Sequence, residues 1–113
     1  MTTKGVSHLN LETHNYGKTV AFWQSLGFSM EFETDHNSGM LVGPNGSHVF
    51  IAERPWLDPV ATDIYLDAGT GGGPAPDGAE VVFDWTATHW STQVMTLRDP
   101  DGRLIRLEAP VGD

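Results

Sequence analysis

The 113-residue sequence contains no cysteine, which excludes disulfide bridges, thiolate metal sites and a cysteine nucleophile. No apolar run approaches the roughly 18 residues that a helix needs to cross a bilayer. The opening segment, MTTKGVSHLN, lacks the apolar core of a signal peptide. We therefore expect a cytoplasmic protein with no membrane partner.

Basic residues are also scarce. Six lysines and arginines stand against fifteen aspartates and glutamates, which gives a formal net charge of −9 at pH 7. Such a charge repels phosphate backbones, so we expect no nucleic-acid partner. The same field attracts cationic small molecules, although an acidic surface can equally serve solubility alone.

Only one segment has the period of an amphipathic helix, residues 14–28 (HNYGKTVAFWQSLGF). The residues of its apolar stripe are Tyr16, Val20, Trp23 and Leu26. Asn15 is suited to the N-cap, and Gly27 predicts the C-terminal end of the helix. We expect Trp23 to pack in the core.

Alternating apolar and polar residues predict eight strands. They cover residues 6–12, 28–34, 40–42, 47–53, 62–68, 79–87, 91–98 and 103–109. Within the second of these strands, alternation places Phe28, Met30 and Phe32 on one face.

Glycines and two prolines crowd residues 69–78 (GTGGGPAPDG), which neither a helix nor a strand tolerates. The first half of the chain therefore reads β-α-β-β-β, and the second half repeats it with a glycine-rich loop in place of the helix. This internal duplication predicts a single α+β domain over residues 1–113, with modules at about 5–54 and 62–110. We expect the free faces of the two modules to form a concave cup.

Three segments carry a resemblance to a known family: HLNLE, TVAFWQSLGF and DPDGRLIRLEAP. Together they resemble the vicinal oxygen chelate superfamily, which includes glyoxalase I, extradiol dioxygenases, fosfomycin-modifying enzymes and bleomycin-resistance binding proteins. Residues 89–102 (HWSTQVMTLRDPDG) are similar to the bleomycin-resistance branch. The resemblance implies two βαβββ modules around a cup, and a homodimer.

The resemblance also implies four positions that hold a divalent ion in the metal-dependent members. Their occupants in this chain are His8, Phe50, Asp63 and Arg106. Where relatives often carry a glutamate, Arg106 supplies a cation that donates hydrogen bonds and accepts none. A guanidinium repels a divalent ion and binds carboxylates well. We therefore expect no metal, no other cofactor and no catalytic residue.

The candidate ligand-binding residues are those expected on the cup face or at its mouth. They are His8, Phe32, His48, Phe50, Trp56, Asp63, Trp85, Trp90 and Arg106. The indoles of Trp85 and Trp90 can stack on a flat ligand, or can pack in the core or in a dimer seam. Arg106 can recognise an anionic or carbonyl group, or can form an ion pair with Asp63. Trp56 fits an interface or a surface position as well as the cup mouth.

Three functions remain open on these grounds. The leading hypothesis is a non-catalytic protein that binds an aromatic or cationic small molecule and thereby confers drug resistance. The rival is a metal-dependent lyase, isomerase or dioxygenase of the same superfamily, using His8 with Glu53 or Glu108. The third is a regulatory or assembly module whose cup is empty.

Overall fold

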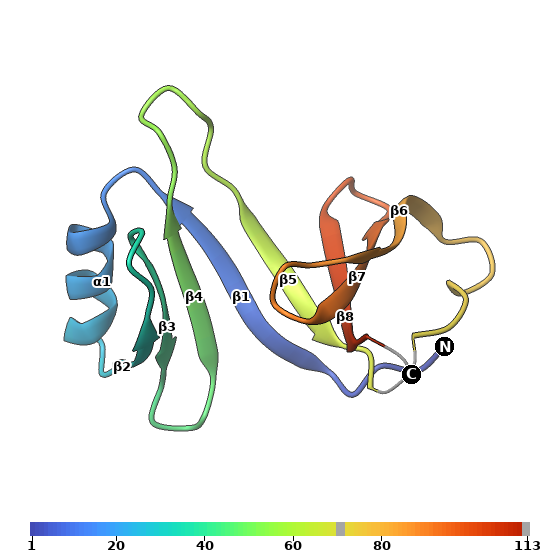
Figure 1. The fold of residues 1–113 in the computed structure, drawn as a ribbon, viewed down its shortest axis with the longest axis horizontal. Coiled ribbons are helices and arrows are strands. Elements are labelled where there is room, and N and C mark those ends of the chain that lie inside the picture. The colour runs from blue at the N-terminus through green and yellow to red at the C-terminus, as the bar shows by residue number, and fades with distance from the viewer. Residues whose placement is uncertain (70–71, 112–113) are drawn as a thin grey trace. The chain divides into compact units, whose positions relative to one another are not determined.

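The computed structural model describes residues 1–69 and 72–111, and these divide into two compact units (Figure 1). The first unit is His8–Thr62, and the second combines Met1–Ser7 with the chain from Asp63 onward. The N-terminal residues belong to the second unit because their backbone pairs with it. Lys4 N donates to Asp67 O at 2.7 Å, and Asp67 N donates to Gly5 O at 2.9 Å.

The elements of the first unit follow the predicted order. They are β1 (Val6–Thr13), α1 (Tyr16–Ser25), β2 (Ser29–Glu33), β3 (Ser38–Val42) and β4 (His48–Glu53). The first two residues of β1 belong to the second unit. The hydrogen-bonded strand order is β2-β3-β4-β1, in which β4 and β1 are parallel and the other pairs are antiparallel.

The predicted helix is confirmed at both ends. The Asn15 side chain accepts a hydrogen bond from Lys18 N at 3.0 Å, which is the N-cap contact that begins a helix. Gly27 has φ +103°, a left-handed conformation that favours glycine just after a helix. Leu26 is the C-cap residue and is 58% exposed, so the apolar stripe ends before it.

The core of the first unit lies between α1 and the sheet. Its buried side chains are Tyr16, Val20, Leu41, Val49 and Ile51, with Leu11, Trp23, Phe28 and Met30 packed against them. The predicted core position of Trp23 is therefore correct.

One facial assignment in β2 was wrong. Met30 lies opposite Leu41 on β3, but Phe32 lies opposite Met40, so one extra residue is inserted between them. This β-bulge turns Phe32 to the opposite face from Met30. Phe32 is 49% exposed, and its ring lies 6.3 Å from that of Phe50.

The second unit repeats the strand order of the first. Its strands are β5 (Thr62–Asp67), β6 (Glu80–Ala87), β7 (Thr92–Arg98) and β8 (Leu104–Pro110). They hydrogen-bond in the order β5-β8-β7-β6, with β5 and β8 parallel. Among the described residues between β5 and β6 there is no helix, as the glycine-rich sequence predicted. Residues 70 and 71 of that loop lie outside the described residues.

The two units can be matched residue by residue through the pairing of their strands. In the first unit one row across the four strands is Phe32, Met40, Phe50 and Asn10. In the second unit the equivalent row is Phe83, Thr96, Arg106 and Tyr65. A bulge also precedes Phe83, as one precedes Phe32. The two units thus share a framework, but the second replaces apolar side chains in this row with polar ones.

No helix in the described part of the chain is long and apolar enough to span a membrane.

Candidate functional site

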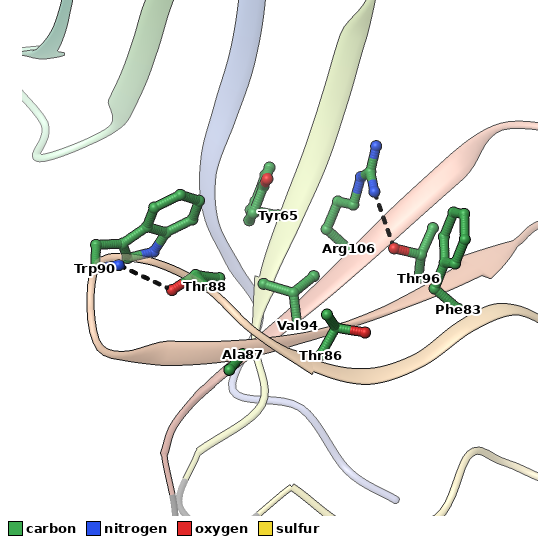
Figure 2. A pocket seen from close by; sticks show the side chains of 9 residues that line it. All are labelled: Tyr65, Phe83, Thr86, Ala87, Thr88, Trp90, Val94, Thr96 and Arg106. Carbon is green, nitrogen blue, oxygen red and sulfur yellow. Dashed lines mark hydrogen bonds between the residues drawn. The ribbon is translucent and has the colours of Figure 1, made fainter.

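A pocket of about 260 Å³ opens on one face of the second unit (Figure 2). Strands β5, β7 and β8 supply its floor, and β6 with the turn after it supplies the wall. The residues that line it are Tyr65, Phe83, Thr86, Ala87, Thr88, Trp90, Val94, Thr96 and Arg106.

Strand register brings the floor residues together. Arg106 on β8 lies between Tyr65 on β5 and Thr96 on β7, since both are its direct partners. Alternation sends the next residue, Leu107, to the opposite face, where it is 2% exposed. Arg106 can therefore lie next to the core residue Leu107 in the sequence of β8, because the two side chains are on opposite faces of the strand.

A second bulge in β6 decides which aromatic side chain reaches the pocket. Phe83 pairs with Thr96 and Thr86 pairs with Val94, so β6 has one more residue than β7 between these pairs. The extra residue brings Phe83 and Thr86 to the same face. Sequence reasoning missed Phe83. The signal that could have found it is the duplication, because Phe83 occupies the place that Phe32 has in the first unit.

Trp85 does not line this pocket. Its indole Nε1 donates to Gly73 O at 2.7 Å, which anchors the glycine-rich segment to β6. A Cβ added at Gly72 would lie 3.0 Å from Trp85 Cε2, so the backbone approaches this ring more closely than a side chain would allow. Trp85 thus holds the segment that stands where the first unit has a helix.

Two threonines fix the turn that carries Trp90. Thr88 N donates to Thr92 O at 2.9 Å, and the two hydroxyls lie 2.9 Å apart. Trp90 N donates to Thr88 Oγ1 at 3.3 Å, as Figure 2 shows. Because the turn is closed by these bonds, the Trp90 backbone has a defined position at the mouth of the pocket.

The Trp90 side chain is held from β8. Its Nε1 donates to Glu108 Oε2 at 2.7 Å, and Thr92 Oγ1 donates to the same oxygen at 2.8 Å. The His89 ring packs edge-on against the indole, with 4.7 Å between centroids. Trp90 remains 51% exposed, so a ligand can reach one side of the ring.

Arg106 has two hydrogen-bond partners on the pocket face. Its Nη1 donates to Thr96 Oγ1 at 2.9 Å, and its Nη2 meets Asp63 Oδ2 at 3.4 Å. The Asp63 side chain is 16% exposed, so this ion pair is largely screened from water. The Nε atom is buried and has no hydrogen-bond partner among the described residues.

Tyr65 keeps its proton in this setting. Burial raises the pKa of its phenol, the charge of Arg106 acts in the opposite direction, and the charges of Glu108 and Asp63 raise the pKa further. The phenol is therefore neutral at physiological pH and can donate a hydrogen bond.

The carboxylates near the pocket do not fit a divalent metal ion. Asp63 already pairs with Arg106, and Glu108 accepts bonds from Trp90 and Thr92. A guanidinium at this place adds positive charge and no electron pair. Within residues 1–69 and 72–111, no three His, Cys, Asp or Glu side chains are grouped to hold a metal. Glu53, an alternative ligand, accepts a hydrogen bond from Tyr16 N at 3.0 Å.

The remaining predicted residues belong to the first unit, and none of them lines this pocket. His48 Nε2 lies 2.9 Å from Glu31 Oε2, and Phe50 packs against Phe32. His8 is half-buried. Trp56 is 76% exposed, with its ring 4.9 Å from that of His14. The structure thus joins Trp90 and Arg106 in one pocket, with Asp63 behind Arg106.

Comparisons with known proteins give structural matches only. No family model matches the sequence, and no curated protein matches it significantly. A glyoxalase/bleomycin resistance protein/dioxygenase superfamily member from Vibrio splendidus 12B01 superposes with a TM-score of 0.66 at 16% identity, over 90% of this chain and 96% of that one. A protein described as NAD-dependent benzaldehyde dehydrogenase from Legionella pneumophila gives 0.66 at 12% identity, over 91% and 97%. BphC, a halotolerant catechol dioxygenase, gives 0.63 at 12% identity, over 96% of this chain and 40% of that one.

Proposed function

Because this chain has the fold of the glyoxalase/bleomycin resistance protein/dioxygenase superfamily, we propose that it is a non-catalytic protein that binds a small planar molecule in the pocket of the second unit. In cells it would act as a cytoplasmic homodimer that sequesters an aromatic natural product or antibiotic. The ligand class comes from the pocket itself, since likeness at 16% identity establishes a fold and no activity.

One observation carries this proposal: three aromatic side chains surround the pocket. Trp90, Phe83 and Tyr65 come from different elements and line the same space. Aromatic rings favour stacked or edge-on contacts with a flat ligand, and apolar burial contributes about 25 cal/mol per Å². The volume of about 260 Å³ lies just below the range of roughly 300–1,000 Å³ that drug-sized ligands occupy. We expect a ligand, or an inserted part of one, about the size of two fused rings.

The chemistry of Arg106 argues against the rival hypothesis of a metal-dependent enzyme. A lyase, isomerase or dioxygenase of this superfamily would need ligands for a divalent ion, and Arg106 pairs with the carboxylate of Asp63 instead. Glu108 is committed to Trp90 and Thr92. The pocket offers stacking surfaces and hydrogen-bond donors, which suit binding.

Tryptophan fluorescence tests the proposal directly, because Trp90 lines the pocket and Trp85 does not. We expect a panel of small aromatic antibiotics and natural products to include compounds that quench or shift the emission in a saturable manner. Trp90→Phe should remove most of this response because it deletes the reporting indole. Trp85→Phe is the matched control and should keep the response.

Two results would contradict the proposed function. The first is a panel in which no compound changes the emission or raises the melting temperature of the protein. The second is stoichiometric zinc, iron, manganese or nickel in protein purified without chelators, because a resident metal would favour the enzyme.

A further inference from the structure

The pocket has a local charge that differs from that of the whole chain. The net charge of −9 favours cationic ligands in general. Of the described residues that line the pocket, however, Arg106 alone is charged. The other polar groups in the lining are the hydroxyls of Tyr65, Thr86, Thr88 and Thr96. A ligand in this pocket therefore meets a cation and hydroxyl groups, and it meets no carboxylate.

The guanidinium of Arg106 is incompletely satisfied by the protein. It has five N–H donors and no acceptor. Thr96 takes one bond at 2.9 Å, Asp63 takes a long one at 3.4 Å, and Nε is buried with no partner among the described residues. Buried donors are nearly always paired in folded proteins. Nε itself is too deeply buried for a ligand to reach, so the donors left for an acceptor that a ligand brings are the remaining N–H groups of Nη1 and Nη2.

The neighbouring carboxylates, Asp63 and Glu108, are not among the residues that line the pocket. Glu108 Oε2 accepts bonds from Trp90 and Thr92 in the turn. Asp63 reaches Arg106 only at Nη2. In the view of Figure 2, Tyr65 lies between Trp90 and Arg106, which places an aromatic surface at one end and the guanidinium at the other.

We propose that the pocket selects aromatic carboxylates, with the ring against Trp90 and the carboxylate on the Arg106 guanidinium. This inference rests on the proposed binding function and names its ligand class, in place of the cationic class that the net charge predicts. Paired N–H groups of arginine match the two oxygens of a carboxylate, and such charge-assisted bonds are stronger than neutral ones.

Three probes with one ring system test the charge preference on the full chain by isothermal titration calorimetry. They are 2-naphthoate, 2-naphthamide and 2-naphthylmethylammonium. We expect 2-naphthoate to bind about tenfold or more tightly than the ammonium probe, with the neutral amide between them. Trp90→Phe should weaken all three, because each loses part of the same stacking surface.

The outcomes separate this inference from the proposed function. Suppose that all three probes bind with similar affinity and that Trp90→Phe lowers the affinity for each. The inference is then wrong, and the binding function stands. If the ammonium probe binds most tightly, the inference is likewise wrong. If none of the probes binds, the proposed function fails, and the inference fails with it.

Variants of the Arg106–Asp63 ion pair distinguish a role of Arg106 in ligand binding from a purely structural role. Asp63→Asn keeps a side chain of the same size but removes the competing charge, so we expect tighter binding of 2-naphthoate and little change for 2-naphthamide. The double variant Asp63→Asn/Arg106→Gln leaves no unpaired charge and should abolish the carboxylate preference. Arg103→Gln is the matched control, since Arg103 is paired with Asp99 and Asp101 outside the pocket. Weaker binding of 2-naphthoate by Asp63→Asn, with the fold intact by circular dichroism, would assign the pair a purely structural role.

Discussion

At the scale of single residues, burial shifts the pKa of two tyrosines in the same direction although their neighbours differ. Tyr16 and Tyr65 are both tyrosines near charged groups, one in each unit. The Tyr16 hydroxyl donates a hydrogen bond to Glu33 Oε2 at 2.7 Å, whereas Tyr65 lies beside Arg106 on the pocket floor. Burial is the largest cause of a raised pKa at both residues.

The pKa of Tyr16 leads to a prediction about alkaline stability. Burial, the hydrogen bond to Glu33 and the charge of Glu33 raise this pKa from 10.0 to about 12. Between these two values the unfolded chain loses the phenol proton while the folded chain keeps it, so the free energy of unfolding falls as pH rises. Urea unfolding from about pH 9 to about pH 12, a range that spans both pKa values, should show this loss. Tyr16→Phe should show a smaller pH dependence, and an equal dependence in both proteins would contradict the assignment.

At the scale of elements, local signals in the sequence begin and end α1 correctly. Asn15 precedes the helix and accepts a hydrogen bond from Lys18 N, and Gly27 follows it with a positive φ. The strands β2 and β6 are less readable, because a bulge in each changes which side chains share a face. A cap depends on residues three or four positions apart, whereas a bulge depends on pairing with another strand.

The helix cap gives a prediction about stability. Asn15→Ala removes the acceptor for Lys18 N, and we expect the free energy of unfolding to fall by ~1 kcal/mol. Asn15→Ser is the control, because serine caps helices about as well as asparagine. Chemical denaturation followed by far-ultraviolet circular dichroism would measure both. A loss in the serine variant as large as in the alanine variant would mean that the cap is not the cause.

At the scale of the whole molecule, the same strand arrangement occurs in both units with different side chains. The row Phe32, Met40, Phe50 and Asn10 in the first unit corresponds to Phe83, Thr96, Arg106 and Tyr65 in the second. The first unit also has a helix over its core, where the second has a glycine-rich segment anchored by Trp85. A duplicated framework with diverged side chains can keep the fold while one copy specialises for a ligand.

Exposed apolar residues lead to a prediction about assembly. Trp56 and Leu57 are 76% and 93% exposed, and adjacent exposed apolar side chains often mark an interaction surface. We expect light scattering coupled to size-exclusion chromatography to give twice the mass of one chain. Trp56→Ser/Leu57→Ser should shift the protein toward the monomer if these residues lie in the dimer interface. A monomeric mass for the unaltered protein at high concentration would rule out the homodimer.

The sequence by itself determined which segments form strands, where the helix begins and ends, and that a loop replaces the second helix. These features depend on periodicity, capping residues and glycine content, which act over a few residues. It also predicted that Arg106 and Trp90 bind a ligand, a role that the proposed experiments test.

Only the tertiary structure decided which side chains meet. Strand pairing produces the bulges that turn Phe32 away from the core and bring Phe83 into the pocket. The tertiary structure joined Trp90 to Glu108 across 18 positions of sequence. It also formed the Arg106–Asp63 pair across 43 positions, one of the two alternatives that the sequence left open for Arg106. It also paired the first residues of the chain with the second unit. Such contacts depend on strand register and on chain segments far apart in sequence, and a local pattern carries no information about either.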